Sequence, residues 1–175
     1  ATVAPLYLDR LGRSLAGKRI ASVVLPDGEQ YKTLDTLARV FDALVDRIAV
    51  ETWLPPAGMT GKFERFDPAP GGSYRLILTY DDPPGAAAKS SADSDIVEAR
   101  FVDIVRNDRV VQAVDFVSND PAYAGTMTMT WAVYATDDGT LVEFTADDVP
   151  DGISAEDHSA GMTSSLENLS DFLSS

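Results

Sequence analysis

The stretch TMTMTWAVY, Thr126–Tyr134, alternates apolar and polar side chains almost without a break. Met127, Met129, Trp131 and Val133 fall on one parity, and three threonines fall on the other. A period of two is typical of a β-strand that buries one face. We therefore predict a strand here, with two methionines and a tryptophan on its inner face.

The same period recurs through the chain after residue 58, where runs of alternating side chains are separated by turn residues such as those of Pro68–Gly72. Further strands are predicted over residues 59–67, 73–80, 96–105, 109–117 and 141–146. Residues 19–25 add a seventh strand near the N-terminus. Because short turns join most of these strands, the sheet should be antiparallel.

Helical spacing of apolar residues marks both ends of the chain. We predict helices over residues 6–15, 33–46 and 154–173, and a short one that carries Val50, Trp53 and Leu54 and ends at Pro55. A bent antiparallel sheet needs a cover for its inner face, and the last helix is long enough. The predicted fold is therefore α+β: a helix-grip fold in which a curved antiparallel sheet of about seven strands wraps a long C-terminal helix, with an extra N-terminal helix.

Composition narrows the classes of function. The chain of 175 residues carries a net charge of −14, no cysteine and one histidine, His158. Disulfides, thiolate metal sites and sites with two imidazoles are therefore excluded, and we expect no metal. Such an acidic chain repels phosphate backbones and anionic lipid surfaces, so neither nucleic acid nor membrane is an expected partner. Without a basic-then-apolar leader or a long apolar run, a cytoplasmic location is expected.

The charge is unevenly distributed along the chain. Residues 1–50 hold seven basic and six acidic side chains, whereas residues 51–175 hold seven basic and twenty-two acidic ones. This asymmetry suggests that the two segments have different origins.

Three runs resemble the SRPBCC (START-like) superfamily, and its closest branch is that of activator of heat-shock protein 90 ATPase homologue-like domains. They are WLPPAGMTGKFERFDPAPGGSYRLILTY (53–80), VVQAVDFVSNDPAYAGTMTMTWAVY (110–134) and DDVPDGISAEDHSAGMTSSLENLSDFL (147–173). The resemblance covers about residues 40–175. It implies a helix-grip fold with an internal hydrophobic cavity and implies no particular reaction.

Residues 1–46 are similar instead to the N-terminal part of 3-dehydroquinate synthase. In that family the DGEQYK motif, here Asp27–Lys32, contacts NAD. The glycine-rich loop that should follow the motif is absent, and the family's zinc needs two histidines. We therefore expect no synthase activity and no cofactor, with Asp27, Glu29 and Lys32 a vestigial NAD motif.

The two resemblances meet at Val40–Asp46, which suits either family. A START-like domain begins with a strand, a turn and a helix, and the synthase-like segment offers the same order. We interpret the chain as a chimera, engineered or produced by recombination. Residues 1–175 would then form a single START-like domain, in which 1–46 supply an N-terminal helix, the first strand and the first helix.

The best candidate site lies between the sheet and the last helix. Gln112 is notable because it takes an inner position where an apolar residue is expected. The alternative for each residue is simple core packing. The predicted ligand-binding residues face the C-terminal helix or lie on it: Tyr74, Leu76, Leu78, Gln112, Val114, Phe116, Met127, Met129, Trp131, Phe144, His158 and Met162.

Three functions stay open at this point. The first is binding of a small hydrophobic molecule in an internal cavity. The second is a protein-interaction module whose partner is a chaperone or a second copy of the chain. The third, a cyclase- or hydrolase-type START-like enzyme, is weaker, because residues 51–175 show no nucleophile–base pair and we assign no catalytic residue. A cavity would favour the first and third functions, and a filled core with an exposed apolar patch the second.

Overall fold

The computed structural model describes residues 19–25, 34–82, 89–136 and 139–175. Seven strands form one antiparallel sheet in the order β1-β7-β6-β5-β4-β3-β2. Their bounds are β1 Arg19–Leu25, β2 Met59–Phe66, β3 Ser73–Tyr80, β4 Ser94–Val105, β5 Arg109–Phe116, β6 Met127–Thr136 and β7 Gly139–Asp147. This confirms the predicted α+β fold and all seven strands.

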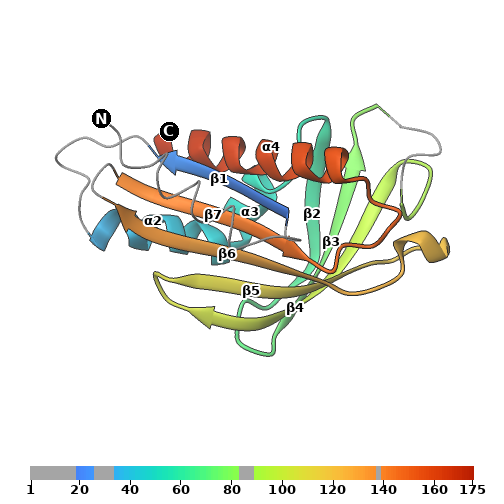
Figure 1. The fold of residues 1–175 in the computed structure, drawn as a ribbon, viewed down its shortest axis with the longest axis horizontal. Coiled ribbons are helices and arrows are strands. Elements are labelled where there is room, and N and C mark those ends of the chain that lie inside the picture. The colour runs from blue at the N-terminus through green and yellow to red at the C-terminus, as the bar shows by residue number, and fades with distance from the viewer. Residues whose placement is uncertain (1–18, 26–33, 83–88, 137–138) are drawn as a thin grey trace.

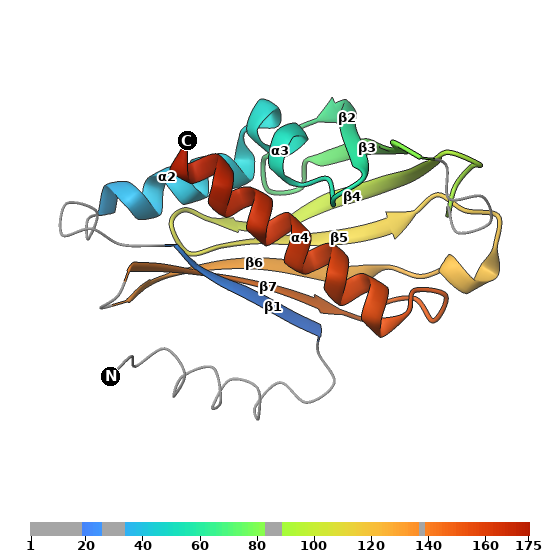
Figure 2. The same cartoon turned by 90° about the horizontal axis from the view of Figure 1, so that it is seen from above.

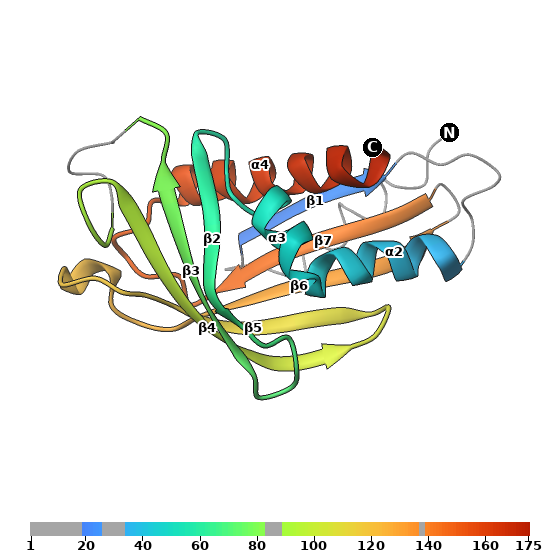
Figure 3. The same ribbon diagram turned by 180° about the vertical axis from the view of Figure 1, so that it is seen from behind.

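The sheet curls around a long helix, α4, which covers residues Ala155–Ser174 (Figure 1). From above, α4 runs across the sheet (Figure 2), and β2 and β3 rise at one end of the curl. Helices α2 (Leu34–Val45) and α3 (Arg47–Trp53) lie inside the same curl (Figure 3). A short 3-10 helix, η2 (Pro121–Tyr123), precedes β6. The predicted helix-grip arrangement is confirmed.

Helix α4 has a clear start and a clear inner face. The Ser154 side chain caps it by accepting a hydrogen bond from the Asp157 N–H, and acidic residues in the first turn suit the helix dipole. Met162, Leu166 and Leu169 are buried at a spacing of three to four residues, as predicted.

The C-terminal half of α4 is fastened to the segment that follows α3. The Ser165 hydroxyl donates to the Leu54 carbonyl at 2.6 Å, and the Asn168 amide donates to the Pro55 carbonyl at 2.8 Å. The Ala57 N–H donates to the Ser164 hydroxyl at 2.9 Å. These bonds connect parts of the chain more than 100 residues apart and hold the helix over the sheet.

Burial alternates along most of β4, as the sequence pattern predicts, whereas consecutive residues are buried at Gln112–Val114 of β5 and Val142–Ala146 of β7. Two bulges interrupt the register, one between Phe63 and Arg65 and one between Phe101 and Asp103. Neither bulge is evident from the sequence pattern. A bulge bends its strand and increases the local twist, which helps the sheet to curl.

The N-terminal segment contributes the edge strand β1. It pairs with β7 over its whole length, with Ala21 opposite Phe144. The predicted helix over 6–15 and the Asp27–Lys32 motif lie outside the described residues. That residues 1–175 form a single domain stays a prediction. In the part of the chain that the structure describes, no helix is long and apolar enough to cross a membrane.

Candidate functional site

A cavity of about 650 Å³ lies between the inner face of the sheet and α4. The structure brings all twelve predicted residues to its wall, and their role in binding stays a prediction. The side chains come from β3, β5, β6, β7 and α4: Tyr74, Leu76, Leu78, Gln112, Val114, Phe116, Met127, Met129, Trp131, Phe144, His158 and Met162.

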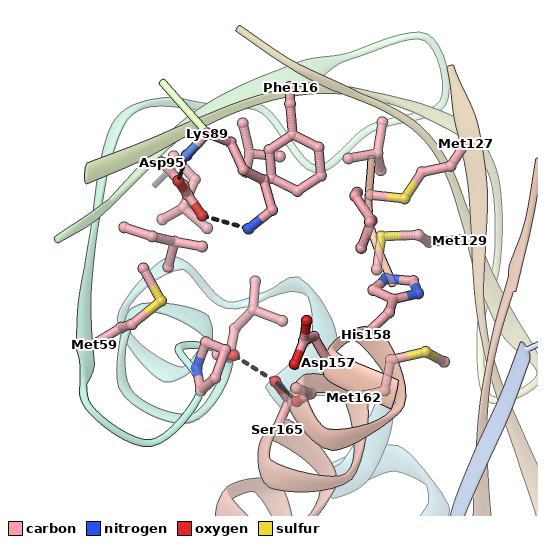
Figure 4. Close-up of a pocket in the computed structure, with 18 of the residues that line it drawn as sticks. Met59, Lys89, Asp95, Phe116, Met127, Met129, Asp157, His158, Met162 and Ser165 are labelled. Atoms are coloured by element: carbon pink, nitrogen blue, oxygen red, sulfur yellow. Dashed lines mark hydrogen bonds and ion pairs between the residues drawn. The ribbon is translucent and has the colours of Figure 1, made fainter. Parts of the chain in front are cut away.

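Methionine side chains border the cavity on two sides: Met127, Met129 and Met162 lie together, and Met59 lies across the cavity from them (Figure 4). The chain has four methionines, Met59, Met127, Met129 and Met162, and all four line the cavity (Figure 4). A thioether chain is flexible and polarisable, so it adapts to irregular apolar shapes. Met59, on β2, was not among the predicted residues, although it shares a strand parity with the buried Phe63.

Stacked aromatic rings close one end of the cavity. The Trp131 ring stacks on Phe144 with centroids 3.6 Å apart, and its edge contacts Trp53 at 5.1 Å. The Trp53 indole N–H donates to the Ala43 carbonyl at 2.9 Å, so its one polar group is satisfied. This end of the site is therefore a rigid wall.

Gln112 lies among apolar residues on the cavity floor. It is 9% exposed and sits opposite Phe101 on β4 and Met129 on β6. Within the described residues its side-chain amide makes no hydrogen bond. A buried amide without a protein partner favours an interaction with water or a ligand.

We expect Gln112→Leu to leave the thermal unfolding midpoint unchanged or higher, because leucine removes a polar group that makes no hydrogen bond to the residues the structure describes. The same variant should bind an apolar probe with a polar group more weakly. Thermal melts and Nile red fluorescence titrations measure the two effects.

Asn168→Leu is the matched control, because the Asn168 amide bonds to the Pro55 carbonyl. It should lower the free energy of unfolding by about 1–2 kcal/mol and leave probe binding unchanged. If Gln112→Leu instead melts as low as this control and binds the probe normally, Gln112 is a structural residue.

A charged cluster that was not predicted from the sequence lies at the opposite end of the cavity from Trp131. The Lys89 ammonium is 2.6 Å from an Asp95 carboxylate oxygen, and the Lys89 backbone N–H donates to the other oxygen at 2.6 Å. The Tyr80 hydroxyl donates to the same carboxylate at 3.0 Å. Lys89 Nζ also lies 5.0 Å from the centroid of the Phe116 ring. All four residues line the cavity.

The cluster could have been found from strand parity. This strand was predicted to begin at residue 96, but β4 begins at Ser94. Asp95 therefore shares the inner face with Val97 and Ala99, and it is almost fully buried. Lys89 follows a stretch of sequence rich in proline, glycine and alanine that carries no periodic signal.

The tyrosine hydroxyls of the site stay neutral. Burial raises the pKa of Tyr74, and burial together with the nearby Asp95 carboxylate raises the pKa of Tyr80. The Tyr80 hydroxyl is engaged by Asp95. It therefore supports the cluster instead of standing ready for a ligand.

His158 and Asp157 lie on the first turn of α4, where this helix forms the opposite wall (Figure 4). The Asp157 carboxylate accepts a hydrogen bond from the Ser154 hydroxyl at 2.7 Å. His158 is half-buried beside the methionines. Within the described ranges, no group of three or more histidine, aspartate and glutamate side chains is arranged to hold a metal ion.

Comparison with known proteins separates the chain into the two expected parts. Over 45 residues, 26% of the chain, it is 69% identical to the 3-dehydroquinate synthase of Methylococcus capsulatus. Over 45 residues it is 53% identical to the synthase of Azotobacter vinelandii. In both cases the chain spans only 12% of the synthase. The similarity to a short segment of that enzyme is confirmed.

Solved structures resemble the fold over about nine-tenths of the chain. A protein from Chromobacterium violaceum superposes with a TM-score of 0.74 at 22% identity, over 91% of this chain and 99% of that one. An AHSA1-like protein from Aeromonas hydrophila superposes with a TM-score of 0.65 at 14% identity, over 90% and 92% of the two chains. At these identities the likeness establishes the fold.

The sequence itself matches a family profile. Residues 36–174 match the family described as "Activator of Hsp90 ATPase homolog 1-like protein". This match covers α2, the short helix α3, strands β2 to β7 and α4, and so every element that lines the cavity. The chain therefore belongs to the activator of Hsp90 ATPase homolog 1-like family.

Proposed function

We propose that this protein binds a small, largely apolar molecule in the cavity between the sheet and α4. The observation that carries the proposal is the cavity of about 650 Å³, whose wall holds every methionine of the chain. Ligand sites usually enclose about 300–1,000 Å³ and combine apolar walls with a few polar groups. Gln112, Lys89 and Asp95 are polar groups of this kind.

The size of the space argues against a simple packing gap. Protein interiors are close-packed, and the few voids they contain rarely exceed a water molecule. Next to the cavity the packing is tight, because Val110, Val142 and Leu169 are fully buried. The cavity lies below the N-terminal half of α4, whose lining residues run from Asp157 to Ser165.

The chaperone-interaction alternative takes its support from the family description. An interaction module would be expected to expose a continuous apolar patch. Among the described residues, the exposed large apolar side chains are Ile48, Val102, Val117 and Tyr134. They come from α3, β4, the segment after β5, and β6. We therefore favour ligand binding.

The methionines allow a direct test of the proposal. In protein labelled with ¹³C at the methionine methyl groups, all four methyl resonances should shift when the neutral apolar dye Nile red is added. The reason is that every methionine borders the proposed site. The measurement is a two-dimensional ¹H–¹³C titration.

A cavity-filling variant supplies the control. Met129→Trp should weaken Nile red binding by about tenfold or more, because the larger ring occupies the space where the dye would sit. Ile48→Trp adds the same ring at a site that is 74% exposed and should have no effect. Equal binding by both variants, or methyl resonances that do not respond, would overturn the proposed function.

A further inference from the structure

The polar end of the cavity has a definite charge balance. Among the ion pairs of the described residues, Lys89–Asp95 is the one whose partners both line the cavity. The Asp95 side chain is 2% exposed and the Lys89 side chain is 21% exposed. The pair therefore forms a neutral unit held largely away from water, and the Tyr80 hydroxyl adds no charge.

The two members of the pair differ in what they can offer a ligand. Asp95 already accepts hydrogen bonds from the Lys89 backbone N–H, the Lys89 ammonium and the Tyr80 hydroxyl. A carboxylate has about four acceptor positions, so Asp95 is close to saturated. An ammonium has three donors, and Lys89 uses one of them on Asp95. Figure 4 shows this ammonium directed into the cavity. The polar end therefore offers donors, and a ligand must bring an acceptor.

The charge of that acceptor follows from the surroundings. A carboxylate on the ligand would give this enclosed region a net negative charge, because Asp95 already neutralises Lys89. The Asp157 carboxylate on the opposite wall is exposed, so it adds a weaker, solvent-screened repulsion. Burying an uncompensated charge is costly, whereas a carbonyl or hydroxyl oxygen can accept from Lys89 without adding charge.

We infer that the ligand is an uncharged, mostly apolar molecule with one carbonyl or hydroxyl oxygen, which accepts a hydrogen bond from Lys89. This inference rests on the proposed function and adds the class of ligand. It assigns Lys89 as the group that binds the oxygen. Asp95 is a positioning residue that sets the charge preference.

Three probes of similar size and shape test this preference: 2-acetylnaphthalene, 2-ethylnaphthalene and 2-naphthoate. The first carries a carbonyl, the second no polar atom and the third a carboxylate. The binding of each probe is measured by its displacement of Nile red at neutral pH. The ketone should bind more tightly than the hydrocarbon. The ketone should also bind at least about tenfold more tightly than the carboxylate.

A pair of variants tests the cause. Asp95→Asn keeps the size of the side chain and leaves Lys89 without its counter-charge, so affinity for 2-naphthoate should rise at least about tenfold. Asp103→Asn removes the same charge from the Asp103–Arg109 pair, which lies outside the cavity. It should bind all three probes as the unaltered protein does.

Two results would overturn the inference while leaving the proposed function intact. One is equal binding of ketone and carboxylate by the unaltered protein, a comparison that stands even if Asp95→Asn fails to fold. The other is a folded Asp95→Asn variant with unchanged affinity for 2-naphthoate. Failure of Nile red and all three probes to bind would remove the proposed function and this inference together.

Discussion

Replacing Trp131 with alanine is expected to lower the free energy of unfolding by about 3–5 kcal/mol. Trp131 is buried, stacks on Phe144 and contacts the edge of Trp53. Its removal takes away these ring contacts and leaves a void that the rigid sheet cannot close. Urea denaturation, followed by far-ultraviolet circular dichroism, measures the change.

Tyr134→Ala is the matched control for this prediction. Tyr134 lies on the same strand, β6, and is 42% exposed. Its loss should change the free energy of unfolding by less than about 1 kcal/mol. If Trp131→Ala lowers the free energy of unfolding no more than this control does, the wall of the cavity is loosely packed. The volume of the cavity would then be no evidence for a binding site.

The second large effect is expected from Lys89→Met. The substitution removes the ammonium from a carboxylate that stays buried, and breaking a buried ion pair in this way costs about 3–5 kcal/mol. Because the Lys89 side chain is partly exposed, we expect a loss of about 3 kcal/mol, at the lower end of that range. The measurement is urea denaturation at neutral pH.

Two further variants separate the charge from other effects of the substitution. Lys89→Met combined with Asp95→Asn should recover most of the loss, since neither partner then carries a charge. Lys62→Met removes a lysine whose side chain is 76% exposed and pairs with Glu51, and it should cost less than about 1 kcal/mol. A Lys89→Met variant as stable as Lys62→Met would show that solvent already screens the Asp95 carboxylate.

The fold was predictable because its strands bury one face and leave the other polar. That alternation gave the positions of β2 to β7, and it also gave the inner face. Trp131 and Phe144, for instance, were assigned to the same side of the sheet and face each other in the structure. Ten of the twelve candidate residues lie on strands and meet at one cavity for the same reason, whereas His158 and Met162 reach it through the helical spacing of α4.

The missed features depend on contacts between distant parts of the chain. Asp95 was overlooked because a charged residue at the start of a strand is normally solvated, and only its contacts with Lys89 and Tyr80 explain its burial. The bulges at Phe63/Arg65 and Phe101/Asp103 depend on strand pairing, which a single sequence does not display. The volume of the cavity likewise follows from how far the sheet curls.

The four methionines also determine where oxidation can act. The chain has no cysteine, so its only sulfur atoms are those of Met59, Met127, Met129 and Met162, all at the cavity. Conversion of a thioether to a sulfoxide makes a flexible apolar side chain polar. Peroxide can therefore attack sulfur only around the cavity, and a bound molecule would shield those atoms. Oxidative damage to sulfur in this protein would thus be damage to the proposed binding site.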